Sequence, residues 1–128
     1  MNGIKKSKKI VIPQLLCALL LLSGFSACSS VTKDQCLKGD WSALGLEDGQ
    51  NGHPSSRLET HNKACSEYHV TVDENAYAQA RRVGLNKYCT RQNGLREGIK
   101  GNTYWHVCPS KLEAAFLNQY SLGKKLFG

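Results

Sequence analysis

The same eight-residue pattern occurs twice in this chain, with a cysteine on either side of each copy. Residues 45–52 and residues 94–101 both follow the spacing G-L-x-[DE]-G-x-x-G. Glycines four residues apart can lie on one face of a helix and let a second backbone approach closely, and a glycine can also end a short helix in the left-handed conformation. We therefore interpret the two glycine runs as places of close backbone packing or as helix ends.

The spacing of these glycines disfavours a ligand-binding role. A phosphate-binding loop needs G-x-x-x-x-G-K-[ST], or G-x-G-x-x-G between a strand and a helix, and neither copy supplies this. Glu47, Asp48 and Asn51 offer oxygen atoms, but the segment lacks the alternating ligands and terminal Glu of a calcium-binding EF-hand. Side chains of adjacent carboxylates such as Glu47 and Asp48 diverge on a helix, so capping or solvation explains them better than acid–base catalysis. We expect no cofactor and no metal.

The first 27 residues have the organisation of a secretory signal peptide. Four lysines within residues 5–9 precede an apolar run over residues 10–22, and small residues follow it. The run contains Pro13 and Gln14 and is shorter than the roughly twenty apolar residues that a membrane-spanning helix needs. A positive start, a short apolar run and a small-residue end predict export rather than a permanent membrane span.

Ser26 and Ala27 directly precede Cys28, which resembles a bacterial lipobox, although Phe25 stands where an aliphatic residue is usual. In a lipobox the cysteine thiol is acylated and becomes the first residue, and several acyl chains make a lasting membrane anchor. Ser29 follows where an Asp would favour the inner membrane, so the pattern favours the periplasmic side of the outer membrane. The alternative is ordinary cleavage, which releases a soluble periplasmic or secreted protein.

Removal of residues 1–27 leaves a short tether over residues 28–35 and a small domain over residues 36–128. This mature part holds thirteen Lys or Arg residues and ten Asp or Glu residues, a balance of +3. A nucleic-acid partner requires a clustered basic face, whereas these cations are scattered along the sequence. We therefore expect no nucleic acid among the partners.

The domain contains four cysteines: Cys36, Cys65, Cys89 and Cys108. An even number in a small exported chain indicates two disulfides, because the compartment is oxidising and a small domain gains from cross-links. The sequence permits three connectivities. The most economical one joins Cys36 to Cys65 and Cys89 to Cys108, so that each bridge encloses one glycine run and stabilises the fold by roughly 3 kcal/mol.

Three capping boxes indicate where helices begin. They start at Ser56, Thr71 and Ser110, each with Glu three residues later. The apolar periodicity behind them predicts helices over residues 57–68, 73–89 and 111–122, and Asp40 can cap a shorter helix through residue 44. Residues 103–107 have strand-like side chains but are too few for a sheet. The expected fold class is mainly α: a small disulfide-stapled helical domain after a lipoprotein signal peptide.

A zinc site is a second interpretation of one cysteine. His61, Cys65 and His69 are spaced four residues apart, which on a continuous helix places two imidazoles and a thiolate on one side. A disulfide at Cys65 with two ordinary histidines is the favoured interpretation, because exported cysteines are oxidised. No motif such as G-x-S-x-G positions a nucleophile, and we expect no enzyme activity.

An ordered set of cysteines, glycines and aromatic residues runs through nearly all of residues 35–122. It consists of Cys36, Trp41, Gly45, Asp48, Gly49, Gly52, Cys65, Tyr77, Gly84, Tyr88, Cys89, the second glycine run, Tyr104, Cys108 and Pro109. This set resembles a bacterial lipoprotein family known as domain of unknown function 2799. The resemblance implies a location in the cell envelope and a small self-contained domain, and it brings no assigned activity or catalytic residue.

These observations favour a non-enzymatic binding or structural module in the cell envelope. Its expected partners are the membrane, through acyl chains on Cys28, and an unknown envelope protein or cell-wall component. One alternative is a periplasmic inhibitor of a hydrolase, which would use an exposed acidic loop that the balance of +3 disfavours. Another is a metal-dependent enzyme, which a tightly bound metal in the purified protein would favour.

Three large aromatic residues are candidates for contact with a partner. Trp41, Tyr104 and Trp105 lie beside the glycine runs. Aromatic side chains with one polar end are common at binding surfaces, but they are equally suited to a core. For Trp41 burial is the favoured interpretation.

Overall fold

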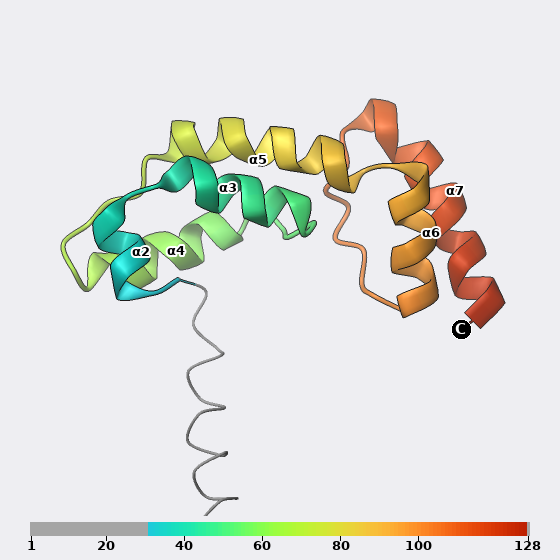
Figure 1. Ribbon diagram of the computed structural model, residues 1–128, viewed down its shortest axis with the longest axis horizontal. Helices are drawn as coiled ribbons and strands as arrows, with labels where there is room; N and C mark the ends of the chain where they lie inside the picture. Colours follow the sequence, from blue (N-terminus) through green and yellow to red (C-terminus); the bar gives the residue numbers. More distant parts are fainter. Residues whose placement is uncertain (1–30, 128) are drawn as a thin grey trace, which may run out of the picture.

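The structure is a computed structural model, and it describes residues 31–127. Its elements are α2 (Lys33–Lys38), α3 (Trp41–Gln50), α4 (Arg57–Ser66), α5 (Glu74–Tyr88), α6 (Arg91–Lys100) and α7 (Ser110–Phe127). They form an arch in which α5 lies across the top, with α2, α3 and α4 below one end and α6 and α7 beside the other (Figure 1). The mainly α fold class is confirmed, and no strand occurs within residues 31–127.

The predicted signal peptide and the predicted lipidation site at Cys28 lie outside the described residues. Within residues 31–127, no helix combines the length and the apolar character needed to cross a membrane. The folded part begins earlier than residue 36, where the sequence placed the start of the domain. Val31 is 6% exposed, and Thr32 caps α2 through a capping box with Gln35. Residues 33–35, predicted as tether, are therefore the first turn of a helix.

The helix boundaries correct two of the predicted caps. Asp73, not Thr71, caps α5 by accepting a hydrogen bond from the backbone N–H of Ala76 at 3.0 Å. Ser56 precedes α4 but makes no side-chain capping bond. The predicted cap at Asp40 is confirmed, because its carboxylate accepts from the N–H of Ala43 at 3.0 Å. The last helix continues beyond residue 122 to residue 127.

Both predicted disulfides are present. Cys36 is bonded to Cys65, and Cys89 is bonded to Cys108, with Cα–Cα distances of 5.3 and 5.6 Å. In each bridge, the first cysteine precedes a glycine run. The second cysteine precedes the helix that packs on that run, which is α5 for Cys65 and α7 for Cys108. The economical connectivity is therefore the one that the fold uses.

The first glycine run forms a face of α3 that packs directly on the backbone of α5. A Cβ atom on Gly45 would overlap the carbonyl oxygen of Tyr77, and one on Gly49 would overlap the carbonyl oxygen of Arg81. The contacts advance along both chains in the same direction, so α3 and α5 run parallel, as Figure 1 shows. Gly52 then ends the run with φ +66°, in the left-handed region that glycine favours.

The second glycine run repeats this arrangement between α6 and α7. Gly94 lies against the carbonyl oxygen of Phe116 and Gly98 against that of Tyr120, while Gly101 has φ +70°. A hydrogen bond across each pair is repeated as well. Arg81 donates to the carbonyl of His53 at 2.8 Å in the first half, and the Tyr120 hydroxyl donates to the carbonyl of residue 102 at 2.6 Å in the second. The molecule consists of two related parallel helix pairs.

Helix α5 connects the two halves because it contributes to both cores. The first core holds Trp41, Leu44, Val72 and Tyr77 together with the Cys36–Cys65 bridge. The second core begins with Leu85 and Tyr88 at the other end of α5 and continues through Tyr104 and Phe116. One helix of fifteen residues therefore fixes the geometry of the space between the halves.

Candidate functional site

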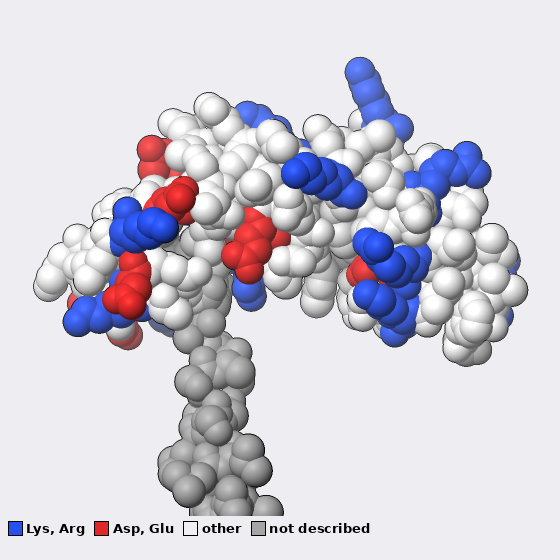
Figure 2. Space-filling view, viewed as in Figure 1, with Lys and Arg blue, Asp and Glu red and all other residues white. Residues whose placement is uncertain are grey.

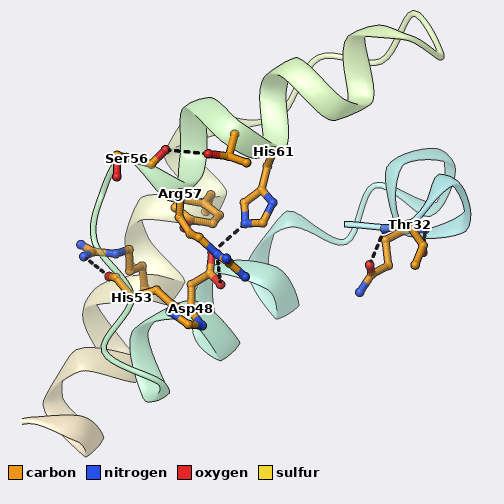
Figure 3. Close-up of polar contacts among 10 residues, drawn as sticks. Thr32, Asp48, His53, Ser56, Arg57 and His61 are labelled. Carbon is orange, nitrogen blue, oxygen red and sulfur yellow. Dashed lines mark hydrogen bonds and ion pairs between the residues drawn. The ribbon is translucent and has the colours of Figure 1, made fainter. Parts of the chain in front are cut away.

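A buried polar cluster joins three helices of the first half. Asp48 of α3 is 2% exposed and His61 of α4 is fully buried. The distance from His61 Nε2 to Asp48 Oδ2 is 2.7 Å, and the hydroxyl of Tyr77 on α5 donates to the same oxygen at 2.6 Å. Arg57 places Nε 3.6 Å from Asp48 Oδ1, and Figure 3 shows Arg57 and His61 pointing toward Asp48 from α4.

The hydrogen bonds of this cluster shift the pKa values of Asp48 and Tyr77. Burial raises the pKa of Asp48, but hydrogen bonds from His61 and Tyr77 outweigh that effect and hold the pKa below its ordinary value. Burial and the hydrogen bond to Asp48 raise the pKa of Tyr77 well above its ordinary value. At neutral pH Asp48 is a carboxylate and Tyr77 keeps its proton. Since Asp48, His61 and Tyr77 are all enclosed, a substrate cannot reach them, and the cluster is a cross-link between helices.

The interpretation of Asp48 as a solvated or capping carboxylate is wrong. It lies three residues after Gly45 and directly before Gly49, on the face that packs against α5. Residues three and four apart share a helix face, so the glycines were the signal that this carboxylate is buried. Its partners come from separate helices, which is why no local pattern revealed them.

The second half has an acid in the corresponding place but no cluster around it. Glu97 in the second glycine run corresponds to Asp48, and Phe116 on α7 corresponds to Tyr77 by its contact with the first glycine of the run. Phe116 has no hydroxyl, and the ring of Tyr104 packs on it with a centroid distance of 4.9 Å. Glu97 therefore stays half-buried, where it accepts a hydrogen bond from Asn102 Nδ2 at 2.9 Å.

A polar cleft lies where the two halves meet, and Glu97 is part of its wall. Its volume is about 540 Å³. The lining comes from the end of α3 and the segment after it, the end of α5, and one face of α6 with the turn beyond it: Gln50, Asn51, His53, Tyr88, Asn93, Arg96, Glu97, Lys100 and Asn102. An adjoining hollow shares five of these residues and adds Thr103 and Trp105. Trp105 stands at the edge of this hollow, and its side chain is 57% exposed.

Neighbouring contacts hold the cleft residues in place. Asn93 donates through Nδ2 to the carbonyl of Tyr88 at 2.8 Å, and its side-chain oxygen accepts from Arg96. Burial lowers the pKa of His53, and the nearby Arg57 lowers it further. Burial raises the pKa of Tyr88 to about 12. At neutral pH the cleft therefore presents a neutral imidazole, a protonated phenol and several amides beside the charges of α6.

The three candidate contact residues have different positions. Trp41 is 8% exposed and belongs to the first core, so its favoured interpretation as a buried residue is confirmed. Tyr104 is 7% exposed, and its hydroxyl accepts from the N–H of Cys108 and donates to Glu113, both at 3.0 Å. Its proposal as a contact residue is therefore wrong, because its ring fills the second core. Trp105 alone among the three offers exposed aromatic surface.

The zinc interpretation also fails on the geometry. Cys65 is bonded to Cys36, His61 is paired with Asp48, and His69 lies beyond the end of α4 with φ 58°. Among residues 31–127, no three His, Cys, Asp or Glu side chains gather in a way that could hold a metal ion.

Comparisons with known proteins place this architecture in a family. No curated protein and no solved structure gives a significant match to the chain. A family model with the description "Protein of unknown function (DUF2799)" matches residues 40–125. The matched range contains both glycine runs, the buried cluster and the whole lining of the cleft. Because the match covers more than half of the sequence, the chain belongs to this family of proteins of unknown function, DUF2799.

Proposed function

We propose that this protein is a non-catalytic lipoprotein of the cell envelope that binds another envelope component in the cleft between its two halves. Acyl chains on Cys28 hold it at the periplasmic face of the outer membrane. The cleft is the observation that carries the proposal. It is concave, its polar groups converge, and an exposed indole stands at its edge, which are the features of a binding site for a small or extended ligand.

The chemistry of the lining favours a polar ligand. Amide side chains such as Asn51 and Asn102 can donate and accept hydrogen bonds at once, which suits a ligand rich in hydroxyl or amide groups. The exposed face of Trp105 can stack on an apolar face of the same ligand. A polar cell-wall component fits this surface better than an apolar molecule does.

A binding role agrees with the positions of the acid–imidazole pairs among residues 31–127. Asp48 and His61 are enclosed within the first half. His106 and Glu113 lie 3.6 Å apart at the surface, but neither residue lines the cleft. The two disulfides support an oxidising compartment, which is consistent with export through the predicted signal peptide.

In-cell photocrosslinking of the acylated protein tests the binding site. A photoreactive residue is introduced at Trp105 or at Asn51 in the cleft, and at Val83, which is 53% exposed on α5, as the control. We expect adducts with cell-wall material or an envelope protein from the two cleft positions and none from the control. Equal labelling at all three positions would contradict the proposed cleft site.

Metabolic labelling tests the anchor separately. Radioactive palmitate should label the wild-type protein and should not label the Cys28→Ser variant. A wild-type protein that takes up no label would remove the anchor from the proposal but would leave the cleft untouched.

A further inference from the structure

The charges of the molecule are divided unequally between its halves. Residues 31–88 hold seven Lys or Arg and eight Asp or Glu, whereas residues 89–127 hold six and two. The first half is therefore close to neutral and the second carries a balance of +4. Figure 2 shows Lys and Arg side chains gathered over α6, and because few acidic residues accompany them, the excess positive charge lies at this end of the arch.

The same end exposes large apolar side chains. Leu122 is 43% exposed, Leu126 61% and Phe127 69% on α7, and Ile99 is 40% exposed on α6. The ends of the two helices lie together, since a Cβ atom on Gly123 would be 2.8 Å from the backbone nitrogen of Ile99. Lysines at positions 100, 124 and 125 lie next to or between these apolar residues in the sequence. We call Ile99, Lys100, Leu122 and residues 124–127 the basic tip.

Apolar side chains among lysines at the end of a helix pair suit the boundary of a lipid bilayer. The apolar groups can enter the boundary between headgroups and acyl chains while the ammonium groups stay in the headgroup layer. Each lysine near an anionic membrane surface adds attraction, and this attraction falls with increasing salt. A soluble partner would also cover apolar groups, but the balance of +4 specifically favours an anionic surface.

The position of the basic tip agrees with the proposed anchor. The start of α2 and the end of α7 both lie along the lower edge of the arch in Figure 1, opposite α5. Three residue steps separate Cys28 from Val31, so Val31, just before α2, is within about 10 Å of the acylated residue. We propose that the basic tip is a second contact with the same membrane, which holds the arch against the bilayer at both ends. This inference rests on the proposed acylation of Cys28.

Fluorescence quenching in vesicles tests the second contact in the full-length acylated protein. The probe is an indole introduced by Phe127→Trp, and the control is Val83→Trp, at an exposed apolar position of α5. Vesicles contain phosphatidylglycerol and phosphatidylcholine, with and without bromine on the acyl chains. We expect brominated lipid to reduce the added fluorescence at least about twofold for Phe127→Trp and not for Val83→Trp. Adding Lys124→Glu and Lys125→Glu should restore the fluorescence.

The outcomes separate the anchor from the basic tip. A protein that fails to float with the vesicles lacks the anchor. A protein that floats but shows equal fluorescence with both lipids at position 127 lacks the second contact, and the inference is then wrong. The emission of the indole at position 127 could instead shift to the blue with the density of protein on the vesicles and not respond to bromine. That result would assign the basic tip to contact between copies of the chain, and it would also overturn the inference.

Discussion

One hydroxyl group separates the polar core of the first half from the aromatic core of the second. Tyr77 donates to Asp48, whereas Phe116 in the corresponding place on α7 has nothing to donate. A buried carboxylate needs donors, because an unpaired charge in an apolar interior is costly. Asp48 is therefore enclosed, while Glu97 remains at the surface of the cleft. This asymmetry between the two copies places Glu97 in the wall of the polar cleft.

Replacing Asp48 by Asn should lower the free energy of unfolding by about 3 kcal/mol at neutral pH. The reason is that the buried side chains of His61 and Tyr77 lose their charged hydrogen-bond partner. The pKa of Asp48 is lowered in the folded state from 3.8. Its contribution is present above that pH and is lost as pH falls through the lower folded value. Urea unfolding should therefore show the difference between wild type and variant shrinking below about pH 4.

Asp40→Asn is the matched control for this experiment. Asp40 is an exposed cap, and Asn caps a helix about as well as Asp, so the expected change is below about 0.5 kcal/mol. If the effect of Asp48→Asn stayed constant across the acid range, the ionised carboxylate would not be the stabilising species.

The contribution of Tyr88 to stability depends on pH in the opposite sense, and it changes at alkaline pH. Burial raises its pKa from 10.0 to about 12, so the unfolded chain loses the phenol proton before the folded chain does. The contribution of Tyr88 is complete below about pH 10 and is lost as pH rises toward the folded value. Tyr88→Phe should therefore lose less stability than wild type over this interval in urea unfolding. Equal losses in the two proteins would show that Tyr88 does not titrate as its burial implies.

At the scale of elements, the glycine runs decide how the helices pair. The sequence predicted α3, α4, α5 and α7 from capping residues or apolar stripes, although Ser56 makes no capping bond in α4. It missed α2 and α6. Helix α6 begins with the polar residues Arg91 and Gln92, and its buried face consists of Asn93, Gly94 and Gly98. A helix that packs through glycine has no apolar stripe to detect.

Gly49→Ala and Gly98→Ala test this packing, because the close contact decides whether each substitution raises or lowers the stability of the fold. Alanine normally favours a helix over glycine by about 1 kcal/mol. Here the added methyl group would overlap a carbonyl oxygen of the partner helix, so each variant should instead lose about 2 kcal/mol or more. Ser42→Ala, at an exposed position of α3, is the control and should be neutral or slightly stabilising. Stabilised glycine variants in thermal unfolding would contradict the close packing.

At the scale of the whole molecule, the shared helix α5 predicts cooperative unfolding. Its first turns pack in one core and its last turns in the other, so neither half can lose its core without disturbing the helix. We therefore expect the two halves to unfold together. Helix α5 is the element that links them, and His53 and Trp105 line the hollow at their junction.

Two tryptophans in different places make this cooperativity measurable. In a Trp105→Phe background, Trp41 reports on the first core alone. Phe116→Ala, at a fully buried position of the second core, should lower the stability that Trp41 reports by about 3 kcal/mol. The fluorescence transition should coincide with the loss of helical circular dichroism. A Trp41 transition that does not move would show that the halves unfold independently.

The sequence by itself determined the helical class, the cap at Asp40 and the close-packing role of the glycines, and it favoured one of three pairings of the four cysteines, which the structure then selected. These features depend on neighbours in the chain or on short repeated spacings. Only the tertiary structure decided that Asp48 is buried with His61 and Tyr77, that Tyr104 belongs to a core, and that the cations of α6 and α7 gather at one end. The physical reason is that burial and surface charge arise from side chains on separate helices. Their meeting depends on how the two glycine-faced pairs are joined through α5.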